Sequence, residues 1–456
     1  MSDVVVIGAG PAGLLAALET AEAGHDVVVL EAAEHVGGMA ASFYVAGQSV
    51  DLGSHRLHPA TDQALMKRLA MLLGPDLQPR QRNGRIRLRD RWVGFPLRAV
   101  DMVRSLPVDF SVMSARDTLA GPLRRINGES FADEVTRRLG PTIFREFYEP
   151  YAKKLYGLDP VLLDAELANR RITASSPLHI LRRVVSASRS GGRLFWYPRH
   201  GYGEIAERLA GAAVEAGVEL RLGASVDTVD LGARCVSASG ESFDAKVVLS
   251  TMPVQTLANA MTDAVPADVL ESLGKLRTRG MVLVYAVLDV DQYTPFDAHY
   301  FPEAGIAMAR LSEPKNYRDG PDPAGQSVLC AEYACSPGDR IWAMSTSDLG
   351  ELLADDLARA GLPAARIVHA EARRLPSVYP VYETANQEDR ARVDAWVQGL
   401  DGLLSFGRQG LGVPDNVHHV LAMGSAAATA VSLDGPRRRD RWAASLAEFT
   451  THVVQD

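Results

Sequence analysis

The chain has 456 residues, 47% of them hydrophobic, which is enough apolar material for two closely joined globular domains. Its formal net charge is −8 at pH 7 and its basic residues are dispersed, which argues against nucleic-acid binding because phosphate recognition needs a basic face. The three cysteines, Cys235, Cys330 and Cys335, lack the spacing of metal ligands and suit a reducing compartment, so we expect a cytoplasmic protein.

Membrane insertion is not expected from this sequence. No stretch reaches 18 consecutive apolar residues, and the N-terminus enters a strand without the basic region of a secretory signal. Residues 98–113 are mildly amphipathic, which allows a peripheral membrane contact but equally fits a helix packed on its own domain. The sequence is compatible with a monomer or a homodimer.

A strand, a glycine-rich turn, a helix and a second strand follow one another in residues 4–31. The turn has the pattern G-x-G-x-x-G at Gly8, Gly10 and Gly13. The first glycine permits a tight turn, the second lets the backbone approach a pyrophosphate, and the third lets the helix lie close to the sheet. Glu31 follows at a distance of about 20 residues, where a carboxylate can bind ribose hydroxyls. We therefore predict a dinucleotide site, the simpler alternative being a tight turn without a ligand.

Gly37 and Gly38 follow the second strand and, like the first glycines, place no side chain near the phosphates. This extension of the motif favours FAD over NAD. Together, "GAGPAG", Glu31, "VGG" and "DLGSHR" resemble the flavin-dependent amine oxidase superfamily. Its relatives include protoporphyrinogen oxidases, carotenoid-type desaturases and, more distantly, UDP-galactopyranose mutases. Oxidases of the family usually carry arginines on both sides of the paired glycines. Here those places hold His35 and Met39, so other groups would neutralise the phosphates.

Residues 85–195 are expected to be mostly helical. Ser130 and Asp133 form a plausible capping box, and Pro141 can start the next helix, whose aromatic stripe is most simply core. The segment 147–172 resembles a helical insertion of protoporphyrinogen-oxidase-like proteins, which caps the substrate cavity.

The sequence returns to α/β character after residue 195. A helix ending near Gly217 is followed by a strand near Val226 and by a sheet strand in "KVVLSTMP" that ends near Thr251. The resemblance implies that Val226 lies at the adenine end of FAD and Thr251 beside the cofactor. Residues 265–400 alternate strands and helices and would supply the second wall of a substrate cavity.

Near the C-terminus, Gly407 and Arg408 match a Gly-Arg pair that contacts phosphate in the family. Asp415 or Asn416 would cap the following helix, whose N–H groups would face the flavin pyrimidine edge. A helix cap without a ligand is the alternative interpretation.

These segments predict an α/β fold with a discontinuous, Rossmann-like FAD-binding domain, an α+β substrate domain and a helical insertion. The expected ranges are 1–80, 196–262 and 401–456 for the FAD-binding domain, 81–195 for the helical cap region and 263–400 for the substrate domain. The residues expected to contact FAD are Gly8, Gly10, Pro11, Ala12, Gly13, Glu31, Gly37, Gly38, Met39, Ser54, His55, Arg56, Val226, Thr251, Gly407, Arg408, Asn416 and Val417.

The stretch "DLGSHRLHP" (51–59) places His55, Arg56 and His58 together. A metal site there would need more ligands, and only His418 and His419 form a comparable cluster, so no metal is expected. In the family the residues after this turn lie along the isoalloxazine ring, where a histidine or arginine can tune the flavin and orient the substrate. For His58 an ordinary surface loop is a real alternative.

No second dinucleotide fingerprint is visible, which favours direct hydride transfer from a substrate to flavin N5 and reoxidation by oxygen or another acceptor. We predict an FAD-dependent oxidase or dehydrogenase acting on a CH–NH or CH–CH bond of a small organic or secondary-metabolite substrate. Arg279 and Gly280 stand where amine oxidases commonly have a lysine. This departure favours protoporphyrinogen-oxidase-like or desaturase-like chemistry over simple amine oxidation.

Two other functions fit the sequence. A UDP-galactopyranose-mutase-like enzyme would act on a nucleotide sugar without net redox change, with Arg310, Tyr379 and Tyr382 around the substrate. These tyrosines could also simply line an aromatic cavity or pack in a core. A non-catalytic flavoprotein is the third. The candidate catalytic residues are His55, Arg56, Arg310 and Tyr379.

Overall fold

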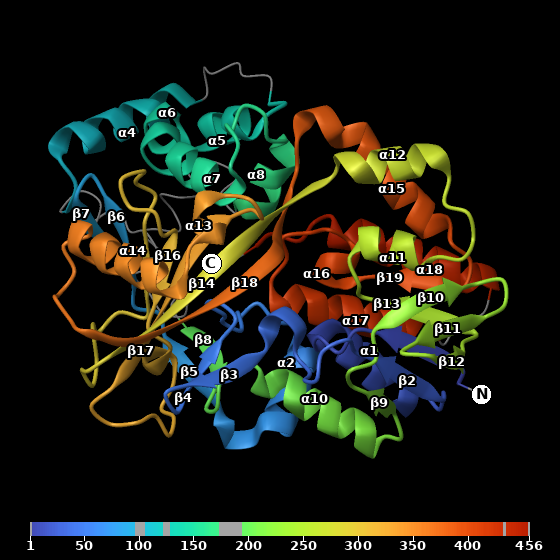
Figure 1. The fold of residues 1–456 in the computed structure, drawn as a ribbon. Helices are drawn as coiled ribbons and strands as arrows, with labels where there is room; N and C mark the ends of the chain where they lie inside the picture. Colours follow the sequence, from blue (N-terminus) through green and yellow to red (C-terminus); the bar gives the residue numbers. More distant parts are fainter. Residues whose placement is uncertain (1, 96–104, 122–127, 173–193, 432–434, 455–456) are drawn as a thin grey trace.

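A five-stranded parallel sheet forms one half of the protein, seen in the lower right of Figure 1. The computed structural model describes residues 2–95, 105–121, 128–172, 194–431 and 435–454. The sheet has the order β19-β13-β1-β2-β9, and all its pairings are parallel. Its strands are β1 (Val4–Ile7), β2 (Val27–Leu30), β9 (Glu219–Arg221), β13 (Val247–Ser250) and β19 (Leu403–Ser405). The sheet therefore joins segments from the whole length of the chain, as the discontinuous-domain prediction requires.

Both faces of this sheet are covered, which explains why β1 and β2 are uninterrupted runs of buried apolar residues. On one face pack α1 (Pro11–Glu22), α10 (Glu204–Glu215) and α17 (Val417–Val431). The other face is covered by an antiparallel sheet of β10 (Val226–Asp230), β11 (Cys235–Ala238) and β12 (Glu241–Asp244). Helices α1 and α17 touch through Gly424, where an added Cβ would lie 2.4 Å from the carbonyl oxygen of Ala12.

A seven-stranded mixed sheet forms the second half, in the order β18-β14-β17-β16-β15-β6-β7. Its long strands β14 (Arg277–Leu288) and β18 (Ile367–Val381) pair antiparallel and cross the middle of Figure 1. The remaining strands are β17 (Ser327–Cys335), β16 (Arg310–Ser312), β15 (Ala298–Tyr300), β6 (Gly84–Leu88) and β7 (Arg91–Phe95). Helix α14 (Thr346–Arg359), which begins with a capping box at Ser345 and Asp348, packs on this sheet.

The expectation of a mostly helical region from about residue 85 was wrong for residues 85–95. Strands β6 and β7 form a hairpin, and β6 pairs with β15, more than 200 positions later in the chain. Burial alternates along β6, where Gly84, Ile86 and Leu88 are buried and the intervening arginines are half-buried. This period of two is the strand pattern, and the pairing partner that stabilises it is remote in sequence.

Helices follow this hairpin and form the teal cluster at the upper left of Figure 1. They are α4 (Val108–Ala120), α5 (Phe131–Leu139), α6 (Pro141–Ile143), α7 (Glu149–Tyr156) and α8 (Ala165–Arg171). The capping box of Ser130 and Asp133 at the start of α5 is confirmed. The helix predicted from Pro141 starts there but passes through a π-helical turn (η4, Phe144–Tyr148). Phe144 and Tyr151 pack against one apolar cluster, and Phe147 stacks on Tyr151 with 5.6 Å between ring centres.

Two small antiparallel sheets tie these parts together. One consists of β3 (Ser42–Val45) and β4 (Gln48–Asp51), and the other of β5 (Leu77–Gln81) and β8 (Leu194–Pro198). Strands β5 and β8 flank the expected cap region, 81–195, so this pairing supports our proposal that the region is an insertion. Residues 96–104, 122–127 and 173–193 of that region, including much of the amphipathic segment 98–113, lie outside the described residues.

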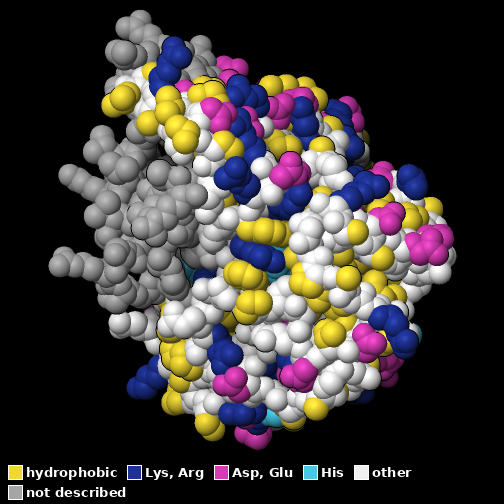
Figure 2. All heavy atoms as spheres, turned by 90° about the vertical axis from the view of Figure 1, so that its left-hand side faces the viewer, with side chains coloured by type: hydrophobic (Ala, Val, Ile, Leu, Met, Phe, Trp, Pro, Cys, Tyr) yellow, Lys and Arg dark blue, Asp and Glu magenta, His cyan; other side chains and the backbone are white. Residues whose placement is uncertain are grey.

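On the face shown in Figure 2, the described lysine and arginine side chains do not form one continuous basic patch. They are interspersed with acidic and apolar side chains. Within the described ranges, no helix is both long and apolar enough to cross a membrane.

Candidate functional site

A cavity of about 490 Å³ lies between the parallel sheet and the mixed sheet. Ile7 and Gly8 at the end of β1, and Thr251 at the end of β13, form its floor. Opposite them stand Met281 of β14 and Tyr379 of β18. Open parallel sheets bind ligands outside the carboxyl ends of their strands, and this cavity has that position.

The three glycines of the fingerprint have three different surroundings. Gly8 has φ +102°, and a Cβ there would lie 2.2 Å from Thr251 Oγ1, so this turn accepts only glycine. A Cβ on Gly13 would lie 2.0 Å from the carbonyl oxygen of Gly8, which fixes the close contact of helix α1 with the strand. A Cβ on Gly10, by contrast, would meet no atom within 4 Å and would point into open space. The backbone at Gly10 is therefore free for the approach of a ligand.

Glu31 lies at the end of β2 with both carboxylate oxygens in use. Oε2 accepts a hydrogen bond from Ala9 N at 2.7 Å, and Oε1 accepts one from Ala33 N at 2.9 Å. These bonds fix the carboxylate beside the glycine turn, and each oxygen keeps a second lone pair for a ligand hydroxyl.

The structure brings sixteen of the eighteen residues expected at FAD to this one cavity. The lining residues among them are Gly8, Gly10, Pro11, Ala12, Glu31, Gly38, Met39, Ser54, His55, Arg56, Val226, Thr251, Gly407, Arg408, Asn416 and Val417. Gly13 and Gly37 are not among the residues that line the cavity. Gly37 N donates to the carbonyl of Ala9 at 2.8 Å, and a Cβ there would lie 2.9 Å from Ala41 Cα, so both glycines shape the turn from behind. All four candidate catalytic residues line the cavity as well.

His55 stands in the cavity wall as a neutral imidazole. Its ring stacks on Tyr202 at 5.2 Å between centroids, with an angle of 17° between the planes. Burial, reinforced by the charges of Arg310, Arg408 and Arg56, lowers the pKa of His55 to about 3. Its Nδ1 is buried and has no hydrogen-bond partner among the described residues. A buried polar atom of this kind is expected to meet a ligand or water.

Asp51 anchors the turn that carries His55. Its carboxylate accepts hydrogen bonds from Ser42 Oγ at 2.6 Å, from Tyr197 Oη at 2.5 Å and from Tyr202 N at 3.0 Å. Complete burial raises the pKa of this carboxyl in spite of those bonds. The same carboxylate thus holds both the turn and the backbone of Tyr202, the residue on which His55 stacks.

Two arginines of the cavity are paired with carboxylates. Arg56 Nη2 lies 3.2 Å from Asp297 Oδ1. Arg310 donates from Nε to Glu332 Oε1 at 2.8 Å, and Ser54 N donates to the same oxygen at 3.0 Å. Burial by itself would lower the pKa of Arg310. The Glu332 carboxylate outweighs this effect, so the pKa of Arg310 is raised well above its ordinary value. These pairs hold both guanidinium groups in fixed orientations.

Two more arginines flank Tyr379, the one aromatic residue among the described residues that line the cavity. The guanidinium carbon of Arg171 lies 5.2 Å from the centre of this ring, and that of Arg408 lies 5.6 Å from it. Arg408 donates to the backbone carbonyls of Asp415 and Val378 at 2.9 and 2.8 Å, and burial lowers its pKa. No contact of Arg408 with a carboxylate within 4 Å is present among the described residues.

Two residues considered for the substrate lie elsewhere. Tyr382 does not line this cavity but is buried, donates to the carbonyl of Gly412 at 2.9 Å and packs under Arg390, so the core alternative is the correct one. Arg279 binds Asp339 and Ser336, both at 2.8 Å, away from the cavity, and Gly280 lies in β14. No lysine is found among the described lining residues.

Sequence reasoning missed several lining residues. Glu332 could have been found, since it is the one charged residue in the buried strand "SVLCAEYAC". Arg171 follows helix-forming residues without any local sign of a ligand. Val454 lies in the C-terminal segment, which carries no motif. Their contribution depends on contacts with distant parts of the chain.

The residues present fit a flavin dinucleotide. The glycine turn leaves backbone exposed at Gly10, Glu31 stands at the end of the second strand, and His55 Nδ1 is an unsatisfied buried atom at the other end of the cavity. The cavity, the parallel sheet and the mixed sheet together define an FAD-binding oxidoreductase fold.

The comparisons with known proteins agree with this class. Residues 11–396 match the family of flavin containing amine oxidoreductases, and the chain belongs to that family. FAD, expected from the sequence, is thereby confirmed as its cofactor, and the protein is an enzyme of that family.

Relatives with curated sequences match only a short segment. Putrescine oxidase of Kocuria rosea is 44% identical over 82 residues, which cover 18% of this chain and 17% of that protein.

Solved structures match over nearly the whole chain. Reduced UDP-galactopyranose mutase superposes with a TM-score of 0.84 and 21% identity, covering 100% of both chains. Cyclohexylamine oxidase from Brevibacterium oxydans IH-35A gives a TM-score of 0.68 and 16% identity over 94% of this chain and 98% of that one. At these identities the structures establish the shared fold.

Proposed function

We propose that this chain is an FAD-dependent oxidoreductase that oxidises a small organic substrate carrying a negatively charged group. Bound FAD would supply the hydride-accepting chemistry, and the protein would orient the substrate and exclude water. The observation that carries this proposal is the set of guanidinium groups at the cavity, two of which flank its single described aromatic ring.

The charge of the cavity argues against a free amine as substrate. A substrate ammonium placed on the Tyr379 ring would lie close to the guanidinium groups of Arg171 and Arg408. At about 6 Å, with an effective dielectric constant of about 20, the repulsion from Arg408 alone costs about 3 kcal/mol. The same arrangement stabilises a carboxylate or phosphate by a similar amount. We therefore favour oxidation of a CH–CH bond, or of a CH–NH bond in a substrate that also carries an acid group.

The paired arginines suit the binding of that acid group. Glu332 Oε1 binds Arg310 at both Nε, at 2.8 Å, and Nη2, at 2.7 Å, and so fixes the orientation of a guanidinium group that lines the cavity, where a substrate anion would find a preoriented donor. His55 would contribute a neutral imidazole with a vacant Nδ1, able to accept or donate a hydrogen bond without adding charge. Arg56, fixed by Asp297, would hold the segment on which His55 stands.

A UDP-galactopyranose-mutase-like activity is the second candidate. The arginines that favour an anion also suit a diphosphate, and Tyr379 offers a surface for a sugar nucleotide. Reduced UDP-galactopyranose mutase superposes on the full length of this chain, so nucleotide sugars belong among the compounds to be tested. A non-catalytic flavoprotein would retain FAD and turn over none of these compounds.

The first test is anaerobic reduction of the FAD-loaded protein by matched substrates that differ in one charged group. We expect compounds with a carboxylate or phosphate to bleach the flavin absorption faster than their neutral or amine analogues. The variant Arg171→Gln should raise KM for the acidic compounds at least about tenfold, which is about 1.4 kcal/mol of binding. Arg366→Gln, at an exposed site in the loop just before β18, is the control. Faster reduction by simple amines would refute the proposal.

The second test separates the two candidates and identifies the acceptor. Photoreduced protein is mixed with oxygenated buffer and flavin reoxidation is followed by absorption. Rapid reoxidation is expected for an oxidase, whereas slow reoxidation together with conversion of a nucleotide sugar by the reduced protein would establish the mutase.

A further inference from the structure

Four histidines form a stack beside the cavity, which we call the histidine stack: His58, His418, His419 and His452. Successive ring centres are 5.5, 4.0 and 4.3 Å apart. The rings come from the loop after β4, from the first turn of α17 and from the C-terminal segment. The sequence showed only the two pairs near 55 and 418, because His452 joins them through the fold.

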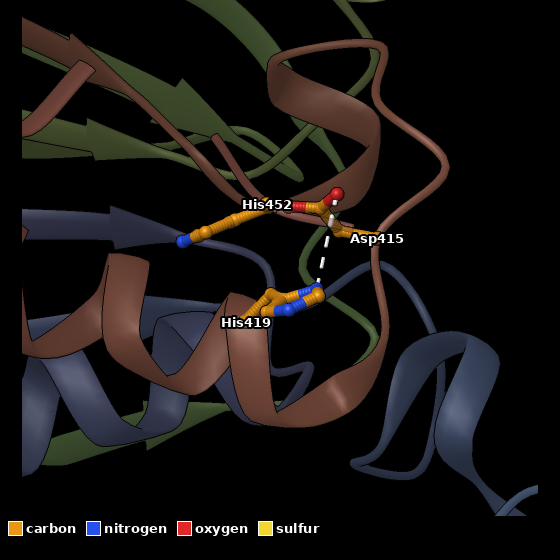
Figure 3. A group of neighbouring side chains, drawn as sticks. All are labelled: Asp415, His419 and His452. Carbon is orange, nitrogen blue, oxygen red and sulfur yellow. Dashed lines mark hydrogen bonds and ion pairs between the residues drawn. The ribbon is translucent and has the colours of Figure 1, made fainter. Parts of the chain in front are cut away.

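The stack ends at a buried carboxylate, Asp415, which faces two of these rings. His452 Nδ1 lies 2.7 Å from Asp415 Oδ2, and His419 Nδ1 lies 3.9 Å from Oδ1. Figure 3 shows His419 rising from α17 toward Asp415, with His452 above it on the same side of the helix. One ligand atom from each of the three residues lies within 4.8 Å of the others.

Asp415 has an unused acceptor. Its side chain is 0% exposed, and Oδ1 makes no hydrogen bond within the part of the chain that the structure describes. Arg170 Nη1 approaches Oδ1 only to 3.8 Å, while Arg170 Nε is bound to Glu166 at 3.0 Å. A buried carboxylate oxygen without a partner needs an explanation, and a missing water or ion is one of those known in native proteins. Asp415 also lines the main cavity, so the oxygen lies at its edge.

The ring nitrogen of His419 on this side already acts as an acceptor. His419 Nδ1 accepts a long hydrogen bond from Asn416 N at 3.4 Å, which a metal ion would replace. Metal ligation requires a ring nitrogen with a lone pair of this kind.

We propose that Asp415, His419 and His452 bind one divalent transition-metal ion of the Zn²⁺ type. Two imidazole nitrogens and one carboxylate oxygen are a known ligand set for such ions, and a water would complete the tetrahedron. The rings of His419 and His452 are now nearly parallel, at 12°, so ligation turns His452 out of the stack. The proton that His452 Nδ1 shares with Asp415 Oδ2 would move to Nε2 of the same ring, so that neutral His452 could ligate the metal through Nδ1.

The ion would fasten the C-terminal segment to the start of α17. Val454, two residues beyond His452, lines the main cavity, and its N donates to the carbonyl of Arg170 at 2.7 Å. A bound metal would therefore hold one wall of the cavity in place. This inference is independent of the substrate proposed above.

The test uses the full-length, FAD-loaded protein, freed of metal with a chelator and titrated with ZnCl₂ by calorimetry at pH 7.5. We expect one ion per chain and a rise in Tm of about 2–5 °C at saturation. Titration with Co²⁺, read above 550 nm where oxidised flavin does not absorb, should give the bands of a nitrogen- and oxygen-ligated tetrahedral ion. His419→Gln and His452→Gln should each weaken binding at least tenfold, and His369→Gln, at an exposed strand position, should not.

The absence of stoichiometric binding to the wild-type protein would overturn the proposal, whatever the variants do. So would equal affinity of His452→Gln and His369→Gln. A second group of potential ligands, Asp76, His200 and Glu204, provides a direct competitor, so loss of binding in His200→Gln alone would also overturn it. Circular dichroism and FAD content confirm that each variant is folded.

Discussion

Replacing Gly10 by valine should separate folding from cofactor binding. Gly10 has φ −74° and ψ 172°, which any residue adopts, and a Cβ there meets no atom within 4 Å. The apoprotein should therefore lose less than about 1 kcal/mol of unfolding free energy. The same space is the one through which a pyrophosphate reaches the backbone, so FAD affinity should fall at least about 100-fold, or about 2.8 kcal/mol.

Gly13→Ala should have the opposite pattern. Its Cβ would lie 2.0 Å from the carbonyl oxygen of Gly8, a backbone atom that cannot move without shifting helix α1. We expect a loss of about 3 kcal/mol or more in unfolding free energy, with FAD binding lost as a secondary effect.

The assay compares urea unfolding of the flavin-free proteins with titration of FAD through the quenching of its fluorescence. Gly211→Val, on α10 with open space around its Cβ, controls for introducing valine at a glycine. A Gly10→Val protein that binds FAD with wild-type affinity would refute our assignment of the turn. A Gly13→Ala protein as stable as the wild type would refute the packing argument.

Two further predictions concern histidines. His55→Ala should keep FAD bound but change its absorption spectrum and reduction potential; an unchanged potential, measured by dye equilibration, would place His55 away from the flavin. The pKa of His418, lowered to about 4 from about 6.5 in the unfolded chain, predicts that the unfolded state binds more protons below pH 6.5. Stability should therefore be complete above pH 6.5 and decline as the pH falls toward 4, by up to about 3 kcal/mol. His418→Gln should flatten this decline in thermal unfolding measured across pH, and an unchanged profile would contradict the buried, neutral state of this ring.

The glycine turn and the cavity floor could be predicted because their chemistry is local. Gly8, Gly10 and Gly13 lie within six positions. Gly8 is required by its own positive φ as well as by the distant Thr251, Gly13 by the carbonyl of Gly8, and Gly10 by the ligand. The C-terminal pair of Gly407 and Arg408 was recognisable from the family pattern, and both residues line the same cavity. Whether each lining residue contacts FAD stays a prediction.

The features that sequence reasoning missed depend on contacts between segments that lie far apart in the chain. Strand β6 looked like the start of a helical region because its partner β15 lies more than 200 residues away. The ion pair of Arg310 with Glu332 and the meeting of His452 with Asp415 likewise arise only when separate segments come together. Tyr382 illustrates the same limit. It was considered for the substrate because it follows Tyr379 closely in the sequence, yet its side chain is buried in the core and does not line the cavity.

The order of strands in the parallel sheet has a consequence for biosynthesis. Strand β1, made first, lies between β2 and β13, and the sheet is completed only by β19, near residue 403. Helix α1 is covered by α17, which leaves the ribosome later still. The nascent chain must therefore keep helix α1 incompletely covered until more than nine-tenths of the protein has been translated. Such non-local closure is slow and leaves apolar surface exposed during synthesis, and the cavity for FAD, which Val417 and Val420 of α17 help to line, is complete only after this helix has been made.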